Sequence, residues 1–286
     1  MKKTISVRTI LAILLTLFGL SNALANTGLS LNFGVYTSDK PTEVVKQFKP
    51  VLEVLEKSLS EKLGLSVDIH LQVASTYQKG IANLVDGTVD FARFGPASYV
   101  LAKEKAPGIE VLAMESKKGG KVFYGIICVP GDSPIFEVSE LKGKSFAFGD
   151  ERSTIGRYLS QQHLLEHGIS AKYLTDYEYL GRHDRVGAAV ARKQFDAGAL
   201  KESTFKKLVA KGMPIRAIAS FPNVTKPWIA RNDLNSDHRD AIRAALLEMK
   251  DPAALKVLKK NGFLEGSDDD YSIIRQAIAT NPAFFQ

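Results

Sequence analysis

The sequence predicts an α/β protein with two lobes, each a mostly parallel sheet flanked by helices. Strand-like and helix-like segments follow one another along most of the chain, which is typical of parallel sheets with crossover helices. From residue 236 on, three helices follow with no strand between them, so we expect them to return and pack on the first lobe. The chain then crosses between the lobes twice, near residues 120–124 and 221–228. The predicted divisions are the first part of lobe 1, lobe 2, and the C-terminal part of lobe 1, at residues 26–121, 122–222 and 223–286.

Residues 1–25 are predicted to be a secretory signal peptide. A basic start, Lys2-Lys3, precedes an apolar run at residues 10–20, and Ala23-Leu24-Ala25 is a small-residue cleavage site. The apolar run is shorter than the ~20 residues that a membrane-spanning helix needs. We therefore expect cleavage after Ala25 and export to a bacterial periplasm.

The first lobe begins with two predicted strands on either side of a long helix. Residues 29–36 and 66–73 alternate between apolar and polar side chains, as half-buried strands do. Between them, apolar residues recur at helical spacing from Pro41 until Gly64 ends the helix. The elements expected next are a helix, a strand, a second helix and a second strand, at residues 76–85, 89–94, 96–105 and 111–115.

The second lobe is predicted to alternate in the same way. The strands are expected at residues 122–129, 145–148, 195–200 and 215–221. The helices are expected from 153 to 167, from 184 to 193, and in a segment that ends at Lys211. The three C-terminal helices are expected at residues 241–249, 252–260 and 271–279.

The composition excludes several classes of protein. A chain of 286 residues with 45% hydrophobic and 24% charged residues is neither disordered, collagen-like nor a coiled coil. Lys and Arg number 38 against 31 Asp and Glu, a net charge of +7 that becomes +4 once the leader's three cations are removed. The lysine pairs are scattered without stacking aromatic residues, so we expect no nucleic-acid partner.

Cysteine and metal chemistry contribute little to the expected function. Cys128 is the only cysteine, so no internal disulfide can form, and its apolar surroundings predict a buried, inert thiol. Stability must therefore come from the core, as it can at this size. No glycine-rich phosphate loop, nucleophile elbow or metal-ligand spacing is present, so we expect no cofactor and no metal.

The most informative segment is residues 149–157, where a strand ends and Ser153-Thr154 opens a helix. These hydroxyls can cap the helix. They can also face an anion together with the unpaired backbone N–H groups of the first turn. The spacing of these residues does not distinguish a helix cap from an anion-binding site.

The chain resembles the phosphate, phosphite and phosphonate substrate-binding proteins of ABC importers. The landmarks come in order over almost the whole chain: Leu31–Val35, Val89–Tyr99, Ser153–Gly156, His183 before Ala188–Val190, and Asp196–Ala199. The resemblance implies a two-lobed periplasmic binding protein of the type with two crossovers, which closes on its ligand by a hinge motion. It also implies delivery of a small phosphorus oxyanion to an ABC permease. We expect a monomer that is not an enzyme.

The resemblance also implies a ligand shell. Ser153 and Thr154, with His183 beside them, would contact the oxyanion from one lobe. Tyr77 and Ser98 would contact it from the other lobe. We expect these donors to suffice without a lysine or arginine in the pocket.

This chain departs from the family pattern in two places. Where the family tends to place an aromatic hydroxyl at the first crossover, this chain has Phe123-Tyr124, and either residue is a candidate ligand contact. Where members that bind aminoalkylphosphonates place carboxylates, it has Ser203 and Lys226. We therefore expect phosphite, phosphate or a simple alkylphosphonate as ligand rather than an amine-bearing one.

Two other functions remain alternatives. The same fold could present its ligand to a membrane sensor such as a histidine kinase. Ser153, His183 and Asp196 could also act as a hydrolase triad, although no nucleophile motif accompanies them.

Overall fold

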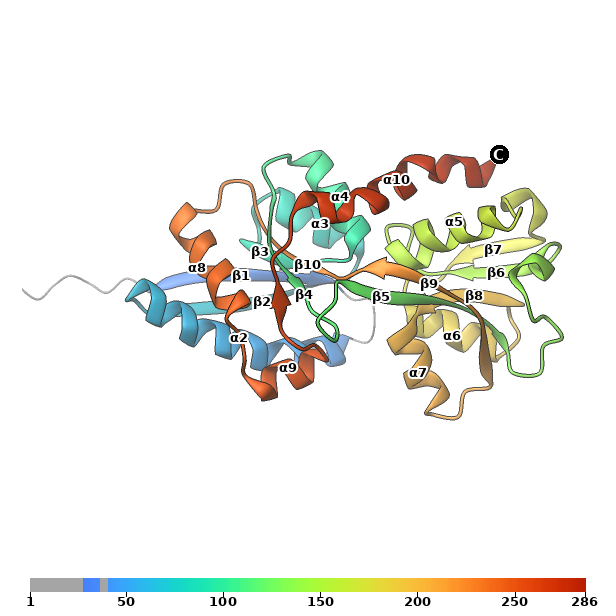
Figure 1. Ribbon diagram of the computed structural model, residues 1–286, viewed down its shortest axis with the longest axis horizontal. Helices are drawn as coiled ribbons and strands as arrows, with labels where there is room; N and C mark the ends of the chain where they lie inside the picture. Colours follow the sequence, from blue (N-terminus) through green and yellow to red (C-terminus); the bar gives the residue numbers. More distant parts are fainter. Residues whose placement is uncertain (1–27, 37–40) are drawn as a thin grey trace, which may run out of the picture.

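The computed structural model describes residues 28–36 and 41–286. The predicted signal peptide and its cleavage site lie outside the described residues. No helix in the described ranges is both long and apolar enough to cross a bilayer. The chain forms two lobes joined by extended strands (Figure 1).

Lobe 1 is built on a six-stranded mixed sheet with the strand order β11-β4-β10-β3-β1-β2. Its strands are β1 (Leu29–Tyr36), β2 (Val67–Ala74), β3 (Phe91–Arg93), β4 (Glu110–Glu115), β10 (Pro227–Ala230) and β11 (Phe263–Leu264). β1 is parallel to β2 and β3, whereas β10 runs antiparallel to β3 and β4. β10 has the opposite direction because it enters lobe 1 on the return from lobe 2.

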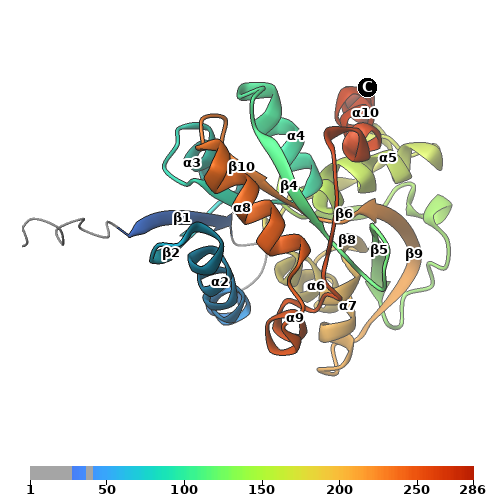
Figure 2. The ribbon, with the colours of Figure 1, turned by 60° about the vertical axis from the view of Figure 1, so that its left-hand side comes forward.

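Helices cover both faces of this sheet (Figures 1 and 2). On one face lie α2 (Pro41–Leu63), α8 (Ser236–Leu247) and α9 (Pro252–Leu258), and on the other α3 (Tyr77–Val85), α4 (Pro96–Lys105) and α10 (Ser272–Thr280). The apolar positions of α2 recur at helical spacing, so they point together into the core. Trp228 of β10 is fully buried beneath α2 and stacks on Phe33, with ring centroids 4.6 Å apart.

Lobe 2 is built on a five-stranded mixed sheet with the order β7-β6-β8-β5-β9. Its strands are β5 (Val122–Pro130), β6 (Ser145–Phe148), β7 (Asp176–Tyr179), β8 (Ala197–Lys201) and β9 (Ile215–Val224). β6 is parallel to β7 and β8, and β5 runs antiparallel to β8 and β9. The predicted α/β class with two lobes is confirmed. It differs from the prediction in that β10 and β5, the strands that enter each lobe from a crossover, run antiparallel to their neighbours.

The remaining helical segments of lobe 2 flank this sheet. They are α5 (Leu159–Glu166), α6 (His183–Ala191), α7 (Glu202–Val209), the short 3₁₀ segments η1 (Val138–Leu141) and η3 (Ala171–Tyr173), and the π-helical turn η2 (Thr154–Tyr158) that leads into α5.

Two neighbouring segments connect the lobes: β4 continues into β5, and β9 continues into β10. They are hydrogen-bonded to each other where they pass between the lobes. Thr225 N–H donates to Lys121 O at 2.8 Å, and Glu115 N–H donates to Lys226 O at 3.1 Å. The lobes are therefore joined by a paired two-stranded connection.

The C-terminal region differs in two ways from the prediction. A two-residue strand, β11, lies between α9 and α10, so the prediction of helices without a strand was wrong. Two residues are too few to produce a recognisable alternation. The last turn, η5 (Asn281–Phe285), packs on lobe 2 rather than lobe 1: Phe284 is fully buried against Phe148, and Asn281 Nδ2 donates to Gln161 Oε1 at 2.7 Å.

Candidate functional site

A small cavity of about 20 Å³ lies between the lobes, next to the carboxyl ends of β1 and β6. The carboxyl ends of strands are where ligands bind in open α/β sheets. The lining residues come from both lobes and from the connection between them: Tyr36, Tyr77, Gly95, Pro96, Phe123, Ser153, Thr154, Ile155, His183, Lys201, Asn223 and Lys226. The volume suffices for about one water molecule, so the two lobes lie close together at this point.

Ser153 and Thr154 are both buried and lie at the start of the π-helical turn. Ser153 Oγ accepts a hydrogen bond of 3.0 Å from Gly156 N–H, so this hydroxyl does cap the turn. Because the oxygen acts there as acceptor, its own proton stays available for another partner. Thr154 Oγ1 instead accepts from Ala97 N–H at 2.8 Å, across the cavity.

Two glycines set the position of the Ser153-Thr154 turn. Gly149 N–H donates to Gly156 O at 2.8 Å, and the two Cα atoms approach closely. A Cβ atom on Gly156 would lie 2.7 Å from the Cα of Gly149, closer than real Cβ contacts. The strand end and the helical turn can therefore touch only because neither residue has a side chain.

His183 is the first residue of α6, and its buried side chain lines the same cavity. Asp196, the third member of the alternative hydrolase triad, lies elsewhere. Its Oδ2 accepts from both N–H and Oγ of Ser145 at 2.8 Å, where β6 and β8 begin. Ser153 follows the end of β6, so the triad residues sit at opposite edges of the sheet and are not assembled.

Tyr36 is a cavity residue that sequence reasoning missed. Its hydroxyl accepts from Gly95 N–H at 2.6 Å and donates to Ser98 Oγ at 2.9 Å, and its ring stacks on Tyr77 at 3.9 Å. Burial raises the pKa of Tyr36 to about 12, so the hydroxyl keeps its proton. Ser98, for which the resemblance implies a ligand contact, lies behind Tyr36 and does not line the cavity. The position of Tyr36 at the end of the first strand was the available signal.

Of the two crossover aromatics, Phe123 lines the cavity. Tyr124 has an exposed fraction of 42% and lines neither this cavity nor the larger one beside it. Successive side chains of a strand point to opposite faces, so only one of the pair can face the ligand space.

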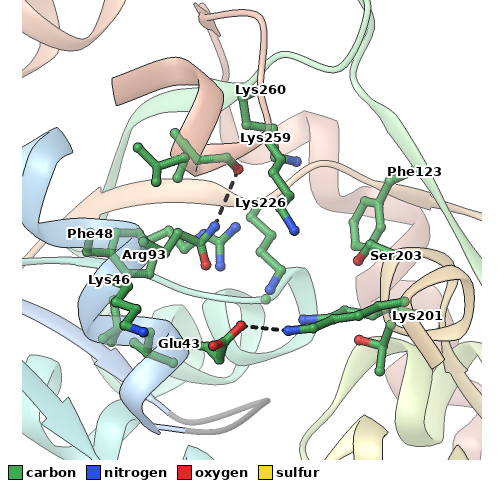
Figure 3. A pocket seen from close by; sticks show the side chains of 18 of the residues that line it. Glu43, Lys46, Phe48, Arg93, Phe123, Lys201, Ser203, Lys226, Lys259 and Lys260 are labelled. Atoms are coloured by element: carbon green, nitrogen blue, oxygen red, sulfur yellow. Dashed lines mark hydrogen bonds and ion pairs between the residues drawn. The ribbon is translucent and has the colours of Figure 1, made fainter. Parts of the chain in front are cut away.

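A larger cavity of about 310 Å³ adjoins the first (Figure 3). Five residues line both: Tyr36, Gly95, Phe123, Lys201 and Lys226. Lys201 and Lys226 line the small cavity as well as the large one, so two lysines accompany the hydroxyl donors that the resemblance implies. Lys201 ends β8 and Lys226 precedes β10, and neither stands in a recognisable sequence motif. Only the tertiary fold brings the two lysines to the same cavity.

Arg93 pairs with Glu115, which is fully buried. Arg93 Nε and Nη2 donate to the two carboxylate oxygens at 2.7 and 3.0 Å, and Lys260 Nζ lies 2.9 Å from Oε2. Burial alone would raise the pKa of Glu115, but the positive charges of Arg93 and Lys260 outweigh it and hold the pKa well below its ordinary value. Glu115 is therefore a carboxylate whose charge is already balanced.

The chain matches, over residues 33–271, the family model described as "ABC transporter, phosphonate, periplasmic substrate-binding protein". The chain belongs to this family. The predicted resemblance is therefore confirmed. The family is a transporter component found in the periplasm, and its description is not that of an enzyme.

Curated relatives of this phosphonate-family protein cover most of its length. It is 27% identical to the "Phosphonates-binding periplasmic protein" of Escherichia coli over 261 residues, which span 86% of this chain and 75% of the relative. It is 24% identical to the "Phosphate-import protein PhnD" of Mycolicibacterium smegmatis, over 83% of this chain and 76% of that one.

Solved structures show that this family member has the expected two-lobed fold. PhnD1 from Prochlorococcus marinus, in complex with methylphosphonate, superposes with a TM-score of 0.75 at 20% identity and covers 89% of this chain and 98% of its own. A binding protein component of an ABC phosphonate transporter from Pseudomonas aeruginosa gives a TM-score of 0.77 at 21% identity, over 90% of this chain and 87% of its own.

Within the described ranges, the phosphonate-family protein has no group of three or more His, Cys, Asp or Glu side chains that could hold a metal ion. The polar groups of the candidate site are hydroxyls, backbone N–H groups, one imidazole and two lysines around the small cavity.

Proposed function

We propose that this chain captures a small phosphorus oxyanion, such as phosphite, phosphate or a simple alkylphosphonate, between its lobes and delivers it to an ABC importer. The observation that carries the proposal is the inter-lobe cavity in which Ser153, Thr154 and His183 from lobe 2 face Tyr36 and Tyr77 from lobe 1. Family membership supports the importer as partner rather than a membrane sensor.

The donors of the site match a tetrahedral oxyanion. When the ligand enters, the bond between Thr154 Oγ1 and Ala97 N–H opens, and both groups can donate to ligand oxygens. The Ser153 proton is available in the same way, because the oxygen already accepts from Gly156. Ala97 lies in the first turn of α4, where backbone N–H groups and the helix dipole favour an anion.

The charge of the site also favours an anion. Lys201 and Lys226 line the cavity from the second lobe and from the connecting strand. Hydrogen bonds to charged groups contribute roughly 1.5 to 3 kcal/mol each, and micromolar affinity corresponds to about 8.2 kcal/mol. Four or five such bonds reach this range once lobe closure is taken into account. Phe123 would close the remaining side of the site.

We further propose that residues 26–121 with 223–286, and residues 122–222, move as two bodies about the paired connection, except that η5 stays with lobe 2. The hydrogen bonds between Thr225 and Lys121 and between Glu115 and Lys226 keep the two connecting strands together during that motion. Ligand binding would bias an arrangement in which Thr154 and Ala97 face each other across the ligand.

We propose export of the chain with cleavage after Ala25, and action as a monomer in the periplasm. The family's periplasmic description supports export. Mass spectrometry of the protein recovered from periplasmic extract gives the cleavage site directly, and a mature N-terminus other than Asn26 contradicts the predicted one.

Isothermal titration calorimetry tests the function with phosphite, methylphosphonate, phosphate, sulfate and 2-aminoethylphosphonate. We expect micromolar or tighter binding of at least one of the first three, and at least tenfold weaker binding of sulfate and of the aminoalkyl compound. Absence of heat with every phosphorus compound would end the proposal. Tight binding of sulfate alone would assign the site to a different class of anion.

A further inference from the structure

The larger cavity beside the proposed oxyanion site is strongly basic. Side chains of seven lysines and one arginine line it, together with only two carboxylates, Glu43 and Glu202. They come from α2, β3, α7, the end of β8, the segments that connect the lobes and the end of α9. Figure 3 shows several of them around one space. Segments far apart in the chain thus converge on one space with an excess of positive charge.

Both carboxylates that line this space are already paired. Glu43 Oε2 accepts from Lys207 Nζ at 2.6 Å, an ion pair between the two lobes. Glu202 is held by Lys117 at 3.0 Å and by Lys206 at 2.6 Å. Neither can neutralise the remaining lysines of the cavity.

Lys226 lies near the middle of the basic group, between Arg93 and Lys201 (Figure 3). In the part of the chain that the structure describes, Lys226 and Lys46 form no ion pair with a carboxylate, and Glu115 is taken by Arg93 and Lys260. Burial and the neighbouring charges of Arg93 and Lys201 hold the pKa of Lys226 well below its ordinary value. An anion placed here would relieve that repulsion.

The basic cavity continues from the oxyanion site. Phe123, Lys201 and Lys226 line both spaces, so a substituent on a phosphonate bound in the small cavity would pass these residues and enter the large one. A volume of about 310 Å³ accommodates an arm of several atoms. An amine at the end of that arm would meet like charges, whereas an acid group would meet Lys226 and Lys46.

We propose that the basic cavity is a second anion subsite, and that this protein prefers phosphonates whose short arm ends in a second anionic group such as a carboxylate. This inference rests on the proposed function of the small cavity. It names a narrower ligand class, which contains two negatively charged groups joined by one or a few carbon atoms.

Titration calorimetry with four compounds tests the preference: phosphonoacetate, which has an acidic arm, ethylphosphonate, which has a neutral one, 2-aminoethylphosphonate, which has a basic one, and methylphosphonate as reference. We expect phosphonoacetate to bind at least tenfold more tightly than ethylphosphonate, and 2-aminoethylphosphonate to bind most weakly. If methylphosphonate binds and phosphonoacetate is no tighter than ethylphosphonate, the second subsite is refuted while the proposed function stands. If none of the four binds but phosphite or phosphate does, the second subsite is refuted while the proposed function stands; if phosphite and phosphate also fail to bind, the proposed function fails as well.

Three lysine variants locate the effect. Lys226→Met and Lys46→Met should each reduce the preference for phosphonoacetate over ethylphosphonate by fivefold or more. Lys49→Met is the matched control, because it removes the same charge from an exposed position one turn along α2 that does not line the cavity. Equal losses for Lys46→Met and Lys49→Met would show a general effect of net charge and overturn the subsite.

Discussion

Thr154 Oγ1 accepts a 2.8 Å hydrogen bond from the backbone N–H of Ala97, and this bond joins the two lobes across the candidate site. Thr154 belongs to the turn that follows β6, and Ala97 belongs to the first turn of α4. The pair of groups that joins the two lobes is thus suited to an oxyanion placed between them. Closure and ligand binding depend on the same atoms.

Replacement of Thr154 by Val tests this relationship. The methyl group keeps the volume but removes the hydroxyl, so we expect the affinity for the tightest phosphorus ligand to fall by at least about 1 kcal/mol, roughly fivefold. The urea midpoint should change little, because the bond to Ala97 N–H joins the two lobes and water can replace it when the lobes separate. Thr280→Val, at an exposed helix end, is the control. If calorimetry shows that Thr154→Val binds the ligand as tightly as the wild type, the ligand does not bind at this turn.

Tyr36→Phe should weaken both the fold and the binding. The hydroxyl accepts from buried Gly95 N–H and donates to Ser98, so its loss leaves a buried donor unsatisfied at a cost of about 1–3 kcal/mol. Urea denaturation measures the loss of unfolding free energy, and calorimetry measures the affinity. Tyr173→Phe removes a half-exposed hydroxyl as the control. Equal stability of the two variants would contradict the role of Tyr36.

Phe123 and Tyr124 make an internal comparison on one strand. Phe123 lines both cavities, whereas Tyr124 is exposed and lines neither. We expect Phe123→Ala to lower ligand affinity by several fold and Tyr124→Ala to leave it within twofold of the wild type. The reverse order in calorimetry would mean that the crossover strand presents its other face to the ligand.

Lys226→Met should make the ligand-free protein more stable while weakening binding. Burial first, and then Arg93 and Lys201, lower the pKa of Lys226 in the fold. Removal of the charge should therefore raise the free energy of unfolding at pH 7 by roughly 0.5–2 kcal/mol. Urea unfolding of wild type and variant gives this difference.

The pH dependence of that difference follows from linkage. Between the lowered folded pKa of Lys226 and its unfolded value of 10.5, the unfolded chain binds more protons, so this lysine's penalty on the wild type shrinks as the pH rises. The stability advantage of Lys226→Met should thus decrease from pH 7 toward pH 10. If the stability difference between Lys226→Met and the wild type is constant over this pH range, its cause is side-chain packing and not the charge of Lys226.

Local sequence signals were sufficient for much of the fold. The apolar spacing of α2 and the alternation of β1 and β2 are properties of neighbouring residues, and the buried faces follow them. The 23 residues of α2 and the eight of each strand are long enough for these periods to repeat. The two residues of β11 are not, and so that strand went unrecognised.

The site was only partly accessible to such reasoning. Ser153, Thr154 and His183 could be predicted to meet because they follow parallel strands or open helices at one edge of a sheet. Whether Phe123 or Tyr124 faces inward depends on the pairing of β5 with β8 and β9, which are distant in the chain. The position of Ser98 likewise depends on tertiary contacts. Ser98 accepts from the Tyr36 hydroxyl and does not line the cavity, and β1 and α4 come together only in the folded lobe.

The sequence by itself determined the order of most elements, the two crossings between lobes and the family, because these depend on residues that are neighbours in the chain. The short strands β7, β10 and β11 were missed. Only the tertiary structure decided that Lys46, Lys201 and Lys226 surround one basic space and that Phe284 at the C-terminus packs on lobe 2. Charges and aromatic side chains on separate segments produce no periodic signal. Whether such side chains form a binding site or a packing contact depends on distances between segments, and these distances are set only when the chain folds.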